Sequence, residues 1–275
     1  MNFKSVRMKI AAIAGLCLVI SSTVLVGYSL YSAKSTQQLV SERVSGLIEM
    51  RSLDGLENLA RHYAGKIAVD FVVALDAART MADIFMVSKS VDNGGLELGR
   101  DQINAILLKV LQDNPNFNGT YSCWEPDALD GMDASFRTGN DGNNAVTGRF
   151  TPYWNRDENG NIAVQSLVEY DTMDRHPNGV LKGGWYIGPR ENHKESVLDP
   201  FPYIVQGKQV WLTTISVPVM VDGKFYGVAG TDYNLDFVQE LSVSVDKELF
   251  DGQGEVIIVS NVGLVVAHSE KPEFI

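Results

Sequence analysis

The chain has 275 residues, 45% hydrophobic and 21% charged, which is the composition of a globular protein rather than a disordered one. Its 34 acidic residues exceed its 23 basic residues and leave a net charge of −11. This balance argues against nucleic acid as a partner, because phosphate binding needs a basic face. The two cysteines, Cys17 and Cys123, provide neither a disulfide framework nor a cysteine-rich zinc site.

The first predicted element is a membrane-spanning helix. Residues 10–27 form an uncharged, mostly apolar run, and about 20 such residues cross a bilayer as a helix. Three basic residues precede the run, Lys4, Arg7 and Lys9, and the positive-inside rule places them in the cytoplasm. A cleaved signal peptide has a shorter apolar region that ends in small residues, so we expect a retained anchor. The prediction is a cytoplasmic segment at 1–9 and a transmembrane helix at 10–31.

A long helical region is predicted next, over residues 33–112. It is almost free of proline, and apolar residues recur at steps of three and four, as in Phe71, Leu75, Ala78 and Ala82. A break at Asp92-Asn93-Gly94-Gly95 separates a second, shorter helix over 100–112, which stops before Asn114-Pro115. The long helix is therefore expected to continue directly from the membrane anchor.

The texture changes at residues 113–245, which we interpret as a β-rich ligand-binding module. Short apolar and aromatic runs alternate with Gly, Asn, Asp and Pro, and clear strands are predicted at 119–124, 210–218 and 227–232. Val221-Asp222-Gly223-Lys224 is a strong hairpin turn signal between the last two strands. Helices first and antiparallel strands afterwards predict an α+β fold.

A second β unit is predicted at residues 246–275, with two apolar strands around a turn at Asn261-Val262-Gly263. Two strands cannot bury a face of their own. The unit is therefore unfinished, completed by another segment, or docked on the first module. Because no second membrane run and no coiled-coil heptads are present, the sequence is interpreted as a truncated receptor with an incomplete second module.

Several motifs, taken in order, resemble the double Cache (dCache) ligand-binding domains of bacterial methyl-accepting chemotaxis proteins. They are Gly119-Thr120-Tyr121 with Trp124-Glu125-Pro126, Gly184-Trp185-Tyr186, Asp199-Pro200-Phe201-Pro202-Tyr203, Thr213 to Val219, and Gly227 to Asp232. The resemblance implies two PAS-like modules, membrane-distal and then membrane-proximal, in the periplasm of a receptor anchored in the inner membrane. It also implies a homodimer formed through the long helix.

The amino-acid-binding branch of that family has an Arg-x-Trp-Tyr motif, a later tyrosine, and an aspartate that holds the ligand's ammonium group. Trp185, Tyr186 and Asp232 match this pattern, whereas Gly183 stands at the arginine position and Phe201 at the tyrosine position. Losing the arginine removes the bidentate donor for a ligand carboxylate. The cation-binding half remains.

The chain also resembles the amine-sensing branch, in the run from Trp124 to Gly131 and in Arg149-Phe150-Thr151-Pro152-Tyr153-Trp154. An organic ammonium needs aromatic faces, which contribute about 0.5–2 kcal/mol each, and carboxylates without a neutralising arginine. The candidate ligand-binding residues are Tyr121, Trp124, Glu125, Tyr153, Trp154, Glu169, Tyr170, Asp171, Trp185, Tyr186, Phe201, Tyr203 and Asp232.

Structural alternatives stay open for the residues that matter most. Asp232 could cap a helix that begins near Asn234, and Trp185 and Tyr186 could be ordinary sheet-packing aromatics. Glu169 and Asp171 would share one face if their stretch is a strand, and Glu125 could simply face solvent.

No catalytic signature is found: there is no nucleophile–base pair, phosphate loop, metal-ligand spacing or cofactor motif. The sequence therefore predicts a non-enzymatic amine or polyamine sensor that signals across the membrane. The alternatives are an amino-acid-sensing receptor, the sensor of a histidine kinase or diguanylate cyclase, and an exported adhesive protein without a ligand.

Overall fold

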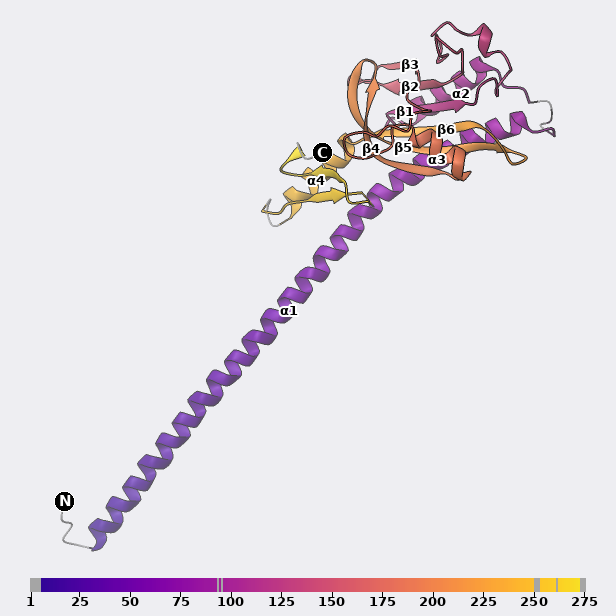
Figure 1. Ribbon diagram of the computed structural model, residues 1–275. Coiled ribbons are helices and arrows are strands. Elements are labelled where there is room, and N and C mark those ends of the chain that lie inside the picture. The colour runs from indigo at the N-terminus through magenta and orange to yellow at the C-terminus, as the bar shows by residue number, and fades with distance from the viewer. Residues whose placement is uncertain (1–5, 93, 95, 250–252, 261, 273–275) are drawn as a thin grey trace. The chain divides into compact units, whose positions relative to one another are not determined.

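The computed structural model describes residues 6–92, 94, 96–249, 253–260 and 262–272 (Figure 1). The chain divides into two compact units, residues 1–66 and 67–275. In chain order the elements are α1 Val6–Lys89, α2 Arg100–Asp113, β1 Gly119–Trp124, a short 3₁₀ helix Asp133–Ser135, β2 Pro152–Arg156, β3 Ile162–Ser166, α3 Gly184–Asn192, β4 Ser196–Val205, β5 Lys208–Val221, β6 Lys224–Asn234, α4 Asp236–Glu248, β7 Ile257–Val259 and β8 Val265–His268. This order confirms the predicted α+β fold.

The first unit consists of the first part of α1. Every side chain of the apolar run at 10–27 is exposed, and α1 is long and apolar enough to cross a membrane. Ser21 and Thr23 return their hydroxyl groups to carbonyls of the preceding turn, at 2.7 Å from Cys17 O and Val19 O. Both hydroxyl groups therefore have a hydrogen-bond partner within the helix. Lys4 of the predicted basic flank lies outside the described residues.

The second unit is built on one antiparallel sheet with the strand order β3-β2-β1-β6-β5-β4. The three strands predicted from the sequence correspond to β1, β5 and β6. The predicted hairpin is confirmed as well: β5 and β6 pair from Val221↔Lys224 onward. Asp222 and Gly223 form the turn with φ of 51° and 77°, the positive values that a two-residue hairpin loop with the twist of the sheet requires. Of the predicted break before α2, Asn93 and Gly95 lie outside the described residues.

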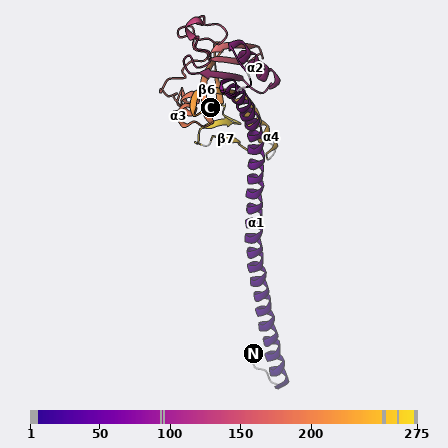
Figure 2. The ribbon, with the colours of Figure 1, turned by 90° about the vertical axis from the view of Figure 1, so that its right-hand side faces the viewer.

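The sheet has two buried faces, and successive residues of each strand alternate between them. One face packs against α2 and the part of α1 after residue 66, through the α1 side chains Ala74, Ala78, Met81, Ala82 and Phe85. The other face lies beneath α3 and carries a cluster of aromatic residues. In Figure 2, α2 and α3 lie on opposite sides of β6. Strand parity therefore decides which side chains of β1 and β6 meet the helices and which meet the aromatic cluster.

The strands β7 and β8 form a separate two-stranded sheet. It packs on α4, where Leu235 and Val238 meet Val266 and Ala267. The Gln239 side chain joins the two elements, because its Nε2 donates to His268 O at 2.9 Å and its Oε1 accepts from His268 N at 3.1 Å. The two-stranded unit thus packs on α4, and its interpretation as an incomplete second module stays a prediction. Asn261 of the predicted turn lies outside the described residues.

Candidate ligand-binding site

Asp232 is a buried carboxylate in the middle of the sheet. It lies on β6, directly opposite Gly119 of β1 and Thr214 of β5, and only 5% of its surface is exposed. Its Oδ1 has no hydrogen-bond partner, and it forms no ion pair with any residue that the structure describes. Burial raises the pKa of Asp232 from 3.8 to about 7, against the opposing effect of hydrogen bonds from Thr214 and Tyr153. Burial favours the neutral form of this carboxyl, and a cation placed beside it would favour the ionised form.

Aromatic rings surround this carboxylate. Tyr121 meets Trp185 edge to face, with ring centroids 5.3 Å apart, and meets Tyr153 at 6.3 Å. Tyr203 continues the wall, 5.9 Å from Tyr153 and 6.1 Å from Phe201. A small, partly open cavity is lined by Tyr121, Leu167, Trp185, Phe201, Tyr203, Leu212, Thr214 and Asp232. Trp185 comes from α3 and the other rings come from three strands, so the site is assembled across the whole sheet.

Two strand glycines make room for the tyrosine rings. Gly230 stands opposite Tyr121, and a Cβ on it would lie 2.1 Å from Cζ of that ring. A Cβ on Gly119 would lie 2.3 Å from Cε2 of Tyr153. The Tyr121 hydroxyl is then fixed by hydrogen bonds with Thr214 Oγ1, at 2.8 Å, and Ser216 Oγ. The rings therefore lie flat on the sheet beside Asp232, with little freedom to turn away.

The cavity measures only about 10 Å³, close to the volume that one water molecule needs. An organic ligand therefore requires a displacement of the walls. Tyr203 also lines a groove of about 750 Å³ on its outer side, together with Val168, Glu169, His176 and Lys182 among others. The backbone N–H of Val168 donates to the Tyr203 hydroxyl at 3.0 Å. Tyr203 and the segment that begins at Val168 thus separate the carboxylate from the groove.

The other three candidate carboxylates already have basic partners. Asp171 binds Arg149 at 2.8 Å and Arg190 at 3.3 Å. Glu125 lies 4.0 Å from Arg149 and accepts a hydrogen bond from the Tyr186 hydroxyl. The third is neutralised elsewhere: Glu169 binds Lys182 at 2.7 Å. Within the described chain, Asp232 is the candidate carboxylate that lacks a cation.

The remaining aromatic candidates fall into two groups. Tyr170 and Tyr186 stack on the Arg149 guanidinium, whose carbon lies 4.5 Å and 5.0 Å from their ring centroids. Trp124 and Trp154 lie on the opposite face of the sheet. Trp124 packs 5.8 Å from Phe85 of α1, and Trp154 donates its indole N–H to Asn104 of α2 at 2.9 Å. The structure brings none of these four side chains into the lining of the cavity around Asp232.

Two of the structural alternatives can now be decided. Asp232 does not cap α4: the Asp236 N–H is bonded by the Asn234 side chain, at 3.2 Å. The sequence also left open a strand around Glu169 and Asp171, which would have put both side chains on one face. The structure has no strand there, because both residues lie in an irregular segment where Glu169 has a φ of 62°. Their shared face therefore does not exist, and their side chains go to different cations.

Gly183 has a structural reason to be glycine. It caps the N-terminus of α3, and a Cβ there would lie 2.7 Å from the Thr172 carbonyl oxygen and 2.8 Å from the Tyr170 carbonyl oxygen. Both neighbours are backbone atoms, so no side chain fits without moving the segment. Trp185 and Tyr186 belong to α3, the helix that follows Gly183, and are not part of a strand.

Sequence reasoning missed Leu167, Leu212, Thr214 and Ser216, which line the cavity or hold the Tyr121 hydroxyl. The hairpin turn alone could not have indicated Thr214 and Ser216. The register of the turn at Asp222-Gly223 would put Thr214 opposite Thr231, and a bulge between Val219 and Met220 shifts the pairing by one residue and brings Thr214 opposite Asp232. Leu167 lies in a loop, where no periodic pattern points to it.

Comparison with known proteins places the chain in a sensor family. Residues 103–240 match the model described as "Methyl-accepting chemotaxis protein-like, first PDC sensor domain". The chain is 31% identical over 270 residues to the methyl-accepting chemotaxis protein TlpQ of Pseudomonas aeruginosa, covering 96% of this chain but only 38% of that protein. The chain thus spans well under half the length of that relative.

Two solved structures share the fold. The extracellular domain of mmHK1S-Z3, named as a histidine kinase, is 31% identical with a TM-score of 0.63, covering 78% of this chain and 69% of that one. Methyl-accepting Chemotaxis protein X is 26% identical with a TM-score of 0.58, covering 72% and 68%. The sensor family and the apolar N-terminal helix together indicate a membrane protein whose sensor domain is extracytoplasmic and not catalytic. The chain belongs to the family of methyl-accepting chemotaxis protein-like first PDC sensor domains.

Proposed function

We propose that this chain is the periplasmic sensor of an inner-membrane chemoreceptor and that it binds organic amines or polyamines at Asp232. The observation that carries the proposal is the state of this carboxylate. It is 5% exposed, has an unpartnered oxygen and no ion pair with a described residue, and faces a cavity walled by Tyr121, Trp185, Phe201 and Tyr203. An ammonium ion supplies the charge and the hydrogen bonds that this oxygen lacks.

The energies favour a cation over a neutral ligand. A charge-assisted hydrogen bond contributes about 1.5–3 kcal/mol, and each well-placed aromatic face adds about 0.5–2 kcal/mol to a desolvated cation. Ligand binding also offsets the cost of ionising a carboxyl whose pKa burial has raised to about 7. A neutral molecule of the same shape gains none of these three contributions.

Amines are favoured over amino acids by what the walls lack. No lysine or arginine is among the cavity's lining residues in the described chain, and the backbone around Gly183 leaves no space for one at that position. A zwitterion would bury its carboxylate without a partner, which costs several kcal/mol. The proposed ligands are therefore diamines, polyamines or aromatic amines, such as putrescine or histamine.

The strand that carries Asp232 is also bonded to α1. Thr231 and Tyr233, its two neighbours, point to the opposite face and donate hydrogen bonds to the α1 carbonyls of Ala74 and Asp70, at 3.2 Å and 2.9 Å. We propose that a displacement of β6 by ligand shifts the equilibrium position of α1, which carries the signal toward the membrane. The likeness to mmHK1S-Z3 keeps a histidine kinase as the alternative output of the same sensor.

Calorimetry of the full 275-residue chain in detergent tests the ligand class. The titrants are putrescine, spermidine, histamine and the twenty amino acids. We expect at least one amine to bind, and to bind more tightly than any amino acid. Binding of amino acids with no binding of any amine would overturn the assignment.

A further inference from the structure

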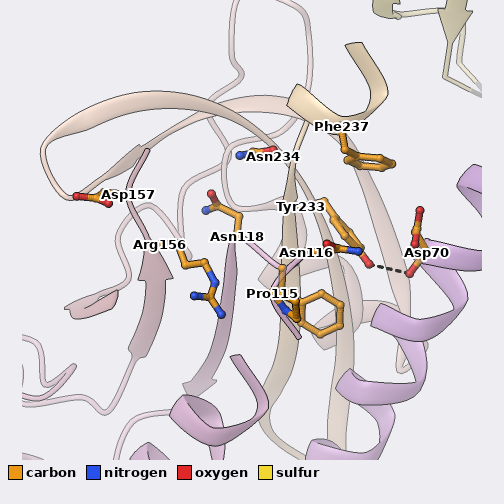
Figure 3. Close-up of a pocket in the computed structure, with 10 residues that line it drawn as sticks. Asp70, Pro115, Asn116, Asn118, Arg156, Asp157, Tyr233, Asn234 and Phe237 are labelled. Atoms are coloured by element: carbon orange, nitrogen blue, oxygen red, sulfur yellow. Dashed lines mark hydrogen bonds between the residues drawn. The ribbon is translucent and has the colours of Figure 1, made fainter. Parts of the chain in front are cut away.

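A second cavity, of about 350 Å³, lies beside the ends of β2 and β6 and the start of β1 (Figure 3). It shares no lining residue with the cavity around Asp232. Small-molecule sites have volumes of about 300–1,000 Å³. This cavity is therefore large enough for a small metabolite as it stands, whereas the first cavity needs its walls displaced.

Arg156 is the only basic residue that lines this cavity in the described part of the chain. The buried or half-buried arginines that the structure describes are Arg100, Arg149, Arg156 and Arg190. Three of them, Arg100, Arg149 and Arg190, each bind a carboxylate, at 2.6–3.3 Å. Arg156 forms no ion pair with any described residue, although the chain carries a net charge of −11. Within this group, it alone lacks a carboxylate partner.

The Arg156 guanidinium still has N–H groups without a partner. Its Nη2 donates to the Leu111 carbonyl oxygen in the last turn of α2, where the helix dipole favours a cation. Its Nε is buried with no partner, and its Nη1 has no hydrogen bond with a described residue. The bond to α2 therefore holds the side chain in place and uses only part of the guanidinium's donors.

The two acidic residues that line the cavity do not neutralise Arg156. The Asp157 carboxylate accepts hydrogen bonds from two N–H groups of its own turn, at 2.9 Å and 2.8 Å. Asp70 lies on the other side of the cavity, and two asparagine side chains and the Tyr233 ring stand between it and Arg156 in Figure 3. The Arg156 side of the cavity is therefore suited to an anion from solution.

The lining favours an anion with a single charge. A guanidinium binds carboxylates by charge-assisted hydrogen bonds, whereas the second charge of a phosphate would be repelled by the two aspartates of the same cavity. Three asparagines supply neutral amide groups, and Tyr233 and Phe237 form an aromatic wall, with ring centroids 5.3 Å apart. We propose that this cavity is a second binding site, for a small monocarboxylate whose carboxylate group binds Arg156.

The test uses the full chain in detergent. The sodium salts of acetate, lactate, pyruvate and benzoate are screened by thermal shift against sodium chloride at the same concentration. Each hit is titrated by calorimetry, with inorganic phosphate as the competing anion. We expect at least one carboxylate to bind. Arg156→Gln should weaken that binding by about tenfold or more, because a charge-assisted hydrogen bond is lost. Arg137→Gln is the matched control, since Arg137 is exposed and lies outside both cavities, and it should leave the affinity unchanged.

Asn116→Asp guards against a folding defect in the arginine variant. Asn116 is exposed and lines the cavity, so this change adds a negative charge to the site and keeps Arg156 with its bond to Leu111. Binding should be weaker by about threefold or more than in Asn140→Asp, which changes an exposed residue outside both cavities.

Four results would overturn the proposal. No carboxylate binds the wild-type chain, binding survives Arg156→Gln, Asn116→Asp and Asn140→Asp bind the carboxylate equally well, or phosphate binds more tightly than every carboxylate. None of these results bears on the amine site at Asp232, because no amine is present in the screen.

Discussion

The Tyr233 hydroxyl donates a hydrogen bond to the Asp70 carbonyl oxygen of α1 at 2.9 Å, and the residue before Tyr233 is the buried Asp232. Strand alternation places the two side chains on opposite faces of the sheet. The carboxylate faces the aromatic cavity and the hydroxyl faces the helix. A movement of β6 therefore changes the position of both the carboxylate in the cavity and the hydroxyl that contacts α1.

Tyr233→Phe should uncouple α1 from amine binding at Asp232 while leaving the amine site intact. The ring keeps its packing against Phe117 and Phe237, and the loss of one hydrogen bond costs about 1 kcal/mol of stability. We expect the amine affinity to stay within about threefold, a difference below 1 kcal/mol. The amine-dependent change in hydrogen exchange over residues 67–89 should be reduced. An unchanged exchange response in Tyr233→Phe would show that the bond does not transmit the displacement.

Gly230→Ala should destabilise the sensor and abolish amine binding together. The new Cβ would lie 2.1 Å from Cζ of Tyr121, whose hydroxyl is held by Thr214 and Ser216, so the ring must leave its position. We expect a loss of about 2–4 kcal/mol in the free energy of unfolding, as for other buried steric conflicts.

Gly188→Ala is the matched control for that substitution. It lies within α3, where the nearest atom to a new Cβ is Ser196 Oγ at 4.0 Å. Alanine is the better helix former, so this variant should be as stable as the wild type or more stable by up to about 1 kcal/mol. Chemical denaturation of both variants makes the comparison, and equal stability of the two would contradict the packing described for Tyr121.

The buried carboxyl should make the empty protein less stable as the pH rises. Because the folded pKa of Asp232 is raised from 3.8 to about 7, its contribution to stability is complete below pH 3.8 and is lost as the pH rises through 7. At about 1.4 kcal/mol per pH unit the loss reaches about 4 kcal/mol. Asp232→Asn avoids it. Denaturation curves should show this variant to be more stable than the wild type at pH 8 and equal to it near pH 4.

Amine binding should release a proton at slightly acidic pH. At pH 6 the empty site holds a protonated Asp232, whose pKa is about 7, and a cation favours the ionised form. The affinity should therefore fall by up to about tenfold per pH unit below pH 7 and level off above it. Titrations at pH 6 in buffers of different ionisation enthalpy measure the released proton. A pH-independent affinity between pH 5.5 and 8 would speak against Asp232 as the anchor.

The sequence predicted the fold where strong local signals exist. The proline-free periodic stretch predicted the long helix, and Asp222-Gly223 predicted the hairpin between β5 and β6. Of the candidate ligand-binding residues, six lie in or beside one aromatic cluster: Tyr121, Tyr153, Trp185, Phe201, Tyr203 and Asp232. That they bind a ligand stays a prediction.

What the sequence could not decide depends on contacts between distant segments. Arg149 neutralises Asp171 and approaches Glu125, and no local pattern in the chain indicates those pairs. The placement of Trp124 could have been predicted, because side chains alternate between the two faces of a strand. Trp124 lies three residues after Tyr121 on β1 and therefore points to the opposite face. Applying that alternation would have separated it, and likewise Trp154 from Tyr153.

The most direct test of the amine site is a calorimetric titration of the wild-type chain and of Asp232→Asn at pH 8, using the amine that binds the wild type most tightly. We predict that Asp232→Asn loses about 100-fold or more in affinity, since a buried charge pair is worth about 2–5 kcal/mol. Glu125→Gln, which changes a carboxylate that already has Arg149 and Tyr186 as partners, should stay within a few-fold of the wild type. An Asp232→Asn chain that binds the amine as tightly as the wild type would contradict the account.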